Sequence, residues 1–254
     1  FMLAPLLVAT SLLAQPGASF ILSALVTAFA GLTLMALSPQ RGNFELTRRQ
    51  GFLVTALSWT VLPVFGALPL TMGAGLSPTD AYFEAVSAMT TTGSTVMTGL
   101  DQTSPPILLW RSLMQALGGV GVIVLSIIMM PFLRVGGMQL FHTESSDKSD
   151  KIVAKAFDLS VWILGIFLVL VLLCGFAYKL LGMTWFDAIN HAMTTVGTGG
   201  FSTHDSSFGY FSGYQTFPAL LWTGFVFMIA GALPFVAFIR LTKGHWREFF
   251  TDIQ

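Results

Sequence analysis

Charged side chains are scarce in this sequence. Only 9% of its 254 residues are Asp, Glu, Lys or Arg, and 54% are hydrophobic, whereas a typical soluble domain is about 25% charged. The twelve basic and twelve acidic residues cancel, so the chain lacks the basic surplus that marks nucleic-acid partners. We therefore expect membrane lipid to surround most of the chain, and we expect no nucleic acid to bind it.

Cysteine is almost absent, and so are the marks of a signal peptide. Cys174 is the single cysteine and lies in an apolar run, so no disulfide can form within the chain. The sequence opens on Phe1 inside an apolar run, with no charged region or cleavage site before it. We expect that the first helix has lost its start and that the sequence is a fragment of a longer protein.

Long apolar segments are abundant, and a helix that spans a membrane needs about 20 such residues. The predicted spans are 1–13 (truncated), 17–37, 51–71, 106–133, 153–181 and 217–239. Two further segments, 78–90 and 185–195, are about half as long. We predict that these two enter the membrane and return to the side from which they came.

The positions of Lys and Arg support this prediction, because cytoplasmic loops are enriched in both. If the short segments return, ten of the twelve basic residues lie on one side: Arg41, Arg48, Arg49, Arg134, Lys148, Lys151, Lys155, Arg240, Lys243 and Arg247. If the short segments crossed fully, the same residues would be divided between both sides. The basic side is therefore predicted to be cytoplasmic.

A polar, glycine-containing run follows each short segment. Irregular backbone at membrane depth is tolerated only where protein buries it or where it lines a water-filled path. Backbone carbonyls can replace the water around a cation without holding the ion too tightly, and glycine allows the backbone angles that turn carbonyls inward. The C-terminal end of a half-helix also favours a cation. The predicted ion-binding residues are Thr91, Thr92, Gly93 and Ser94 in the first run, and Thr198, Gly199, Gly200 and Phe201 in the second.

The two short segments and their polar runs form an internal repeat. Each segment begins with a Ser or Thr cap and an acid three residues later, a pattern typical of a helix start. The interval from Asp80 to Gly93 equals the interval from Asp187 to Gly200. A competing register aligns the two Ala-Met-Thr-Thr runs and matches Gly93 with Gly197. We prefer the first register, because equal helices from equivalent caps deliver their ends to the same depth.

Further polar side chains flank the two runs. They are Glu84 and His191 on the short segments, Arg111 on the next span, and Asp101, His204 and Asp205 at the outer mouth. The first two either bias the pore or hydrogen-bond to a neighbouring loop, and we expect the hydrogen bonds. The arginine either snorkels to the interface or braces a loop carbonyl, and the outer three either concentrate cations or cap a turn. The glycines of 118–121 allow close helix approach, and no organic cofactor is expected.

These residues resemble the Trk/Ktr/HKT superfamily of potassium transporters, and in particular its bacterial Trk-type membrane subunits. The match is carried by Thr90-Thr-Thr-Gly-Ser94, by Trp110-Arg111 with Gly118-Gly-Val-Gly121, and by Gly199-Gly-Phe-Ser-Thr-His-Asp205, and it extends over the whole chain. The resemblance implies an all-α membrane protein with four units of helix, re-entrant pore helix and helix around a potassium path, preceded by an extra helix pair. It assigns potassium ligands to Thr92, Gly93, Gly199 and Gly200.

The resemblance also divides the chain and implies partners. The extra helix pair and its loop occupy 1–50, the first unit 51–135, a cytoplasmic linker 136–150 and the second unit 151–254, two units of the expected four. A homodimer and a cytoplasmic nucleotide-binding regulatory subunit are the implied partners.

Our hypothesis is non-enzymatic potassium uptake by a multi-pass protein of the cell inner membrane. The potassium ion passes a selectivity filter made of backbone carbonyls. One alternative is a secondary transporter with broken helices for another cation or small solute, although the two repeats are parallel, not inverted. Another alternative is a non-conducting scaffold subunit.

Overall fold

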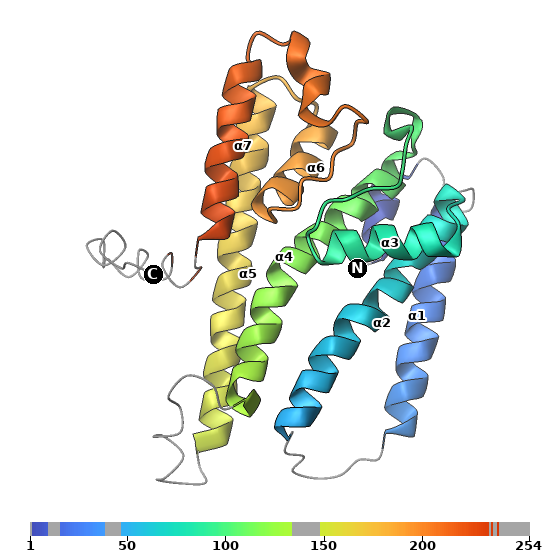
Figure 1. Cartoon of the computed structure of the whole chain (residues 1–254), viewed down its shortest axis with the longest axis vertical. Coiled ribbons are helices and arrows are strands. Elements are labelled where there is room, and N and C mark those ends of the chain that lie inside the picture. Colours follow the sequence, from blue (N-terminus) through green and yellow to red (C-terminus); the bar gives the residue numbers. More distant parts are fainter. Residues whose placement is uncertain are drawn as a thin grey trace.

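The computed structural model describes residues 2–9, 16–38, 47–133, 148–233, 235 and 238. Within them the chain forms the α-helices α1 (Gly17–Leu37), α2 (Arg48–Ala74), α3 (Pro78–Met89), α4 (Pro105–Leu133), α5 (Lys148–Leu180), α6 (Trp185–Val196) and α7 (Phe217–Ala232). The short 3-10 helices are η1 (Ala4–Val8), η2 (Leu100–Gln102) and η4 (Ser207–Gly213). Long helices run along the molecule, and both short α-helices, α3 and α6, lie in its upper half (Figure 1).

Four helices of the described chain are long and apolar enough to cross a membrane: Gly17–Leu37, Arg49–Ala74, Pro105–Leu125 and Asp158–Leu180. Many of their large apolar side chains are exposed, among them Phe29, Leu37 and Leu172. Exposed apolar surface on this scale is unfavourable in water and is the ordinary outside of a helix in lipid. The all-helical membrane fold is therefore confirmed.

Local capping explains where the short helices begin. Ser77 Oγ accepts the backbone N–H of Asp80 at 3.1 Å, and Thr184 Oγ1 accepts that of Asp187 at 3.1 Å. Such a cap satisfies one of the backbone donors left unpaired at a helix start. Both α3 and α6 then run for 12 residues, so their last turns lie equally far from their caps.

Two apolar clusters form the core. The first joins α2, α3 and α4 to Phe20 of α1, where Trp110 meets Phe20 edge to face at 5.9 Å and donates its indole N–H to the Gly66 carbonyl. The second joins α5, α6 and α7, and the Tyr178 and Thr195 hydroxyls bond across α5 and α6 at 3.0 Å. Because α4 packs against α2, α3, α5 and α6, it connects the two clusters.

Two of the predicted spans differ from the helices that the structure shows in the same segments. In segment 1–13, where a truncated spanning helix is predicted, residues 4–8 form the 3-10 helix η1, which ends at an extended Ala9 and packs on α4. In segment 217–239, α7 ends at Ala232, where Leu233 is extended; Phe235 and Phe238 are again helical, and residues 234, 236, 237 and 239 lie outside the described residues. Leu233 precedes Pro234, and a residue before proline avoids the helical region.

Part of the predicted topology lies outside the described residues. This applies to residues 10–13, to the linker 136–150 as far as residue 147, and to Arg41, Arg134, Arg240, Lys243 and Arg247. The cytoplasmic placement of the basic residues stays a prediction.

Candidate functional site

The first loop (90–99) leaves α3 through a tight turn. The backbone N–H groups of Thr92 and Gly93 both point to the Ser87 carbonyl, at 2.9 and 3.5 Å. Thr91 and Gly93 have positive φ values of 54° and 77°, a region that costs a residue with a side chain about 1–2 kcal/mol. Thr91 is therefore held in a strained conformation at the end of a half-helix, a kind of strain that clusters at functional sites.

The second loop (197–206) leaves α6 in the same way. The N–H groups of Gly199 and Gly200 point to the Thr194 carbonyl at 2.9 and 3.2 Å. Thr198 and Gly200 have φ values of 55° and 81°. Gly200 therefore holds the place that Gly93 holds in the first loop, whereas Gly197 is the C-cap of α6.

The two loops lie against each other. A Cβ atom added at Gly93 would overlap the carbonyl oxygen of Gly199, so no side chain separates the two backbones at this point. Glycines of α4 and α7, the helices that follow the two loops, lie equally close to the turns. A Cβ at Gly118 of α4 would overlap the Met89 carbonyl, and a Cβ at Gly231 of α7 would overlap the Val196 carbonyl. Small residues of this kind let helices in membranes approach closely.

Arg111 of α4 contacts residues of both loops. Its guanidinium donates to Glu84 at 2.7–2.8 Å, to Thr95 Oγ1 at 3.0 Å and to the Ser202 carbonyl at 3.1 Å, and it lies 4.2 Å from the Phe201 ring centroid. Arg111 is 1% exposed and Glu84 is fully buried. Of the two alternatives raised for this arginine, it braces a loop carbonyl and does not snorkel.

Glu84 and His191 hydrogen-bond to the loops, as the sequence predicts. Glu84 accepts the Thr95 hydroxyl at 2.8 Å and the Val96 N–H at 3.0 Å. The His191 Nδ1 lies 2.8 Å from the Asp187 carbonyl, so this nitrogen carries the proton. Its Nε2 therefore accepts the Ser202 hydroxyl, 2.9 Å away.

Asp101, His204 and Asp205 join the outer parts of the two loops. His204 Nδ1 donates to Asp101 at 2.5 Å, and Asp205 accepts the Leu100 N–H at 3.1 Å with each of its oxygens. The hydrogen bond from His204 lowers the pKa of Asp101 below its ordinary value. The ring of His204 also stacks on Tyr210 at 3.5 Å. These three residues therefore cross-link the loops and cap their turns.

Sequence reasoning missed Gln115, which lies one helical turn beyond Arg111 on α4. It is fully buried, and its Oε1 accepts the Phe201 N–H at 3.0 Å. A polar side chain in the middle of a membrane helix is itself an indication of function, and that indication was present in the sequence.

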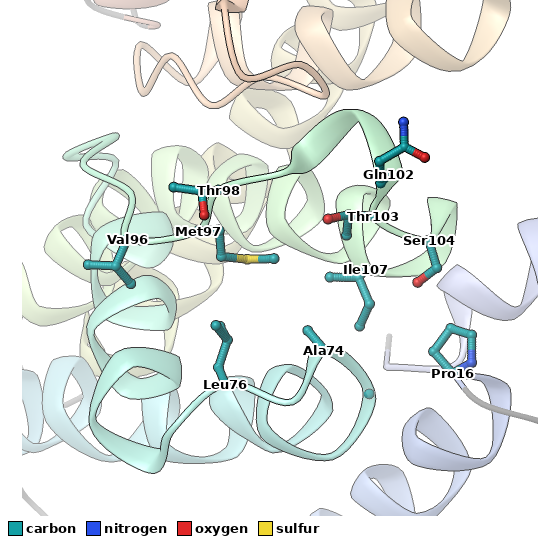
Figure 2. Close-up of a pocket in the computed structure, with 11 residues that line it drawn as sticks. Pro16, Ala74, Leu76, Val96, Met97, Thr98, Gln102, Thr103, Ser104 and Ile107 are labelled. Atoms are coloured by element: carbon teal, nitrogen blue, oxygen red, sulfur yellow. The ribbon is translucent and has the colours of Figure 1, made fainter.

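Two cavities flank the loops. One of about 180 Å³ lies directly beyond the turns and is lined by Thr91, Thr198, Gly119 and Gly231 among others. A larger one of about 480 Å³ lies behind the first loop, where Ala74 and Leu76 face Met97 and Ile107 (Figure 2). Its polar lining residues are Thr98, Gln102, Thr103 and Ser104. None of the predicted ion-binding residues lines the larger cavity.

Spanning helices, half-length helices and tightly bonded polar loops define an all-helical, multi-pass membrane protein. The family model for TrkH, described as a cation transport protein, matches residues 18–249. The chain belongs to this family, and the resemblance to the Trk/Ktr/HKT superfamily is confirmed.

Similar proteins agree with this assignment. The Trk system potassium uptake protein TrkI of Halomonas elongata is 44% identical over 255 residues, covering 100% of this chain and 51% of that protein. TrkH of Vibrio parahaemolyticus is 42% identical over 217 residues, covering 84% and 44%. The crystal structure of the potassium transporter TrkH from Vibrio parahaemolyticus superimposes with a TM-score of 0.81 at 37% identity, covering 98% of this chain and 50% of that one.

The chain spans about half the length of the curated relatives it matches. Family membership together with the apolar helices identifies it as a multi-pass protein of the inner membrane.

Proposed function

We propose that this protein takes up potassium across the cell inner membrane. Its relatives are named for that function. The proposal depends above all on one observation: the backbones of the two loops meet at Gly93 and Gly199, with no side chain between them. Two stretches of glycine-containing backbone in contact at the ends of half-helices can offer several carbonyl oxygens to one dehydrated cation.

Four residues are proposed to supply the ion's ligands: the carbonyls of Thr92, Gly93, Gly199 and Gly200. The matching positive φ values in the two loops support equivalent carbonyl directions on both sides of the ion. Thr91, Ser94, Thr198 and Phe201 complete the proposed filter, and they hold its backbone.

Both short helices are proposed to be re-entrant. Twelve residues rise about 18 Å in an α-helix, whereas the apolar core of a bilayer is about 30 Å thick. Two such helices, each followed by a loop that turns back, support a division into an N-terminal helix pair (1–50) and two units (51–135 and 151–254) joined by a linker (136–150). Two further units are proposed to complete the path.

The cavity of about 180 Å³ is proposed as part of the inner exit from the filter. Thr91 and Thr198 line it at the C-terminal ends of α3 and α6. A helix C-terminus carries a partial negative charge, so both half-helices favour a cation there and disfavour an anion.

A homodimer and a cytoplasmic nucleotide-binding regulatory subunit remain proposals that come from the family resemblance. Among the described residues, no observation favours the alternative of a secondary transporter for another solute.

The filter assignment is tested by measuring ion flux through the protein as its gene encodes it. We expect Gly93→Ser and Gly200→Ser each to reduce the preference for potassium over sodium, because a side chain forces the backbone out of the left-handed region. Gly165→Ala on α5 is the control, because nothing lies within 4 Å of the added Cβ. An unchanged ion preference in both serine variants would reject the assignment.

A further inference from the structure

Gln115 is a buried polar residue that is not among the proposed filter residues. It lies on α4 and is fully buried. A buried primary amide is unfavourable unless its atoms are hydrogen-bonded, so a side chain of this kind in a membrane helix calls for a specific partner. Its Oε1 has one, the N–H of Phe201 at 3.0 Å.

That hydrogen bond fixes the peptide between Gly200 and Phe201. In a trans peptide the N–H and the C=O point in opposite directions. Since the Phe201 N–H points to α4, the Gly200 carbonyl points away from α4. A Cβ added at Gly200 would meet no described atom within 4 Å, so that side of the residue is open.

The next carbonyl, that of Phe201, accepts the Thr194 hydroxyl at 2.8 Å, but among the described residues no other hydrogen bond is made by the peptide between Gly200 and Phe201. Glycine adopts positive and negative φ about equally readily, so this peptide can rotate if its N–H loses the acceptor. The neighbouring N–H bonds to the Thr194 carbonyl fix Gly199 and Gly200 from the helix side. The orientation of the peptide that follows Gly200 therefore depends on the side chain of Gln115.

The same amide also lies beneath both loops. A Cβ at Gly199 would overlap the Gln115 side chain, and a Cβ at Gly93 would lie 3.9 Å from its Nε2. Within the described chain the Nε2 has no hydrogen-bond partner. The oxygen of the amide therefore supplies the one polar contact, and the nitrogen only packs against the backbone.

We propose that Gln115 is a positioning residue that fixes the direction of the Gly200 carbonyl and thereby sets the ion preference, without touching the ion. This inference depends on the proposed potassium path, because it assigns a cause to the geometry of one of its ligands.

The test compares two replacements of similar length in the protein as its gene encodes it, reconstituted in liposomes. Gln115→Glu keeps an oxygen that accepts the Phe201 N–H in either protonation state, and Gln115→Met removes it. We expect the methionine variant to lose about tenfold in potassium-over-sodium preference, which corresponds to about 1.4 kcal/mol of differential stabilisation of the two ions. The glutamate variant should keep most of the preference.

Ser112→Ala is the matched control. Ser112 is buried on the same helix, and its hydroxyl bonds to the Leu108 carbonyl within that helix, so its loss should leave ion preference unchanged. If the methionine variant does not accumulate as folded protein, Gln115→Asn replaces it, because asparagine withdraws the amide oxygen by about 1.5 Å. It should show the same loss of preference.

The possible outcomes separate the two proposals. If the unaltered protein carries no potassium, the proposed function fails. If it carries potassium selectively and the folded methionine and asparagine variants do so equally well, the positioning role fails alone. Equal losses in the glutamate and methionine variants would also overturn it, since the acceptor oxygen would then be irrelevant.

Discussion

Gly93 and Gly200 hold equivalent places in the two loops, but alanine should be tolerated very differently at each. Their φ values are 77° and 81°, so the backbone strain of a side chain is the same at both, about 1–2 kcal/mol. The surroundings differ. A Cβ at Gly93 would overlap the Gly199 carbonyl oxygen, whereas a Cβ at Gly200 meets no described atom within 4 Å.

The overlap adds a second cost at Gly93 alone. Forcing an extra methyl group into a closely packed site costs about 1–3 kcal/mol. Gly93→Ala should therefore destabilise the fold by about 2–5 kcal/mol and Gly200→Ala by about 1–2 kcal/mol. In a chain of this size each kcal/mol lowers Tm by about 2–4 °C, so the two variants should be clearly separated.

Thermal unfolding of the purified variants in one detergent, followed by tryptophan fluorescence, measures the difference. Gly213→Ala serves as the control, because nothing lies within 4 Å of its added Cβ and its φ is not positive. Equal Tm losses for Gly93→Ala and Gly200→Ala would refute the inference that the two loops are in backbone contact at Gly93.

Three further predictions follow from contacts around the loops. Glu84→Gln leaves Arg111 buried without its counter-charge, so the free energy of unfolding should fall by about 3–5 kcal/mol in denaturant titrations. Gly118→Ala drives a methyl group into a backbone carbonyl and should reduce the yield of folded protein in size-exclusion chromatography, whereas Gly31→Ala, with open space around it, should not. The hydrogen bond from His204 lowers the pKa of Asp101. The ionised Asp101 therefore stabilises the fold fully at pH values above 3.8, the ordinary pKa of this group, and this stabilisation is lost as the pH falls through the lowered pKa. Asp101→Asn should remove this loss and so flatten the acid side of the Tm–pH curve.

Local features of the fold were predictable from the sequence. The starts of α3 and α6 follow from their caps, because Ser77 and Thr184 each bond to a backbone N–H only three residues away. The break at the end of α7 is equally local, because Leu233 precedes Pro234 and a residue before proline avoids the helical conformation.

The contacts of the site were much less predictable. The composition of the two loops marks them as unusual, but no pattern in the sequence says that Gly93 meets Gly199. The partners of Arg111 and Gln115, Ser202 and Phe201, lie 86 or more residues further along the chain. Periodicity and capping report neighbours along a helix, so they could not choose between a snorkelling and a bracing arginine.

The helix α4 shapes both loops, since its side chains hold the second loop and its glycines admit the turn of the first. A ribosome completes α4 long before it reaches residue 197. The two α4 side chains that bind the second loop, Arg111 and Gln115, are therefore made before the loop itself. The second half of the chain carries the cap of α6, but the side chains that bind its loop lie on α4, in the first half.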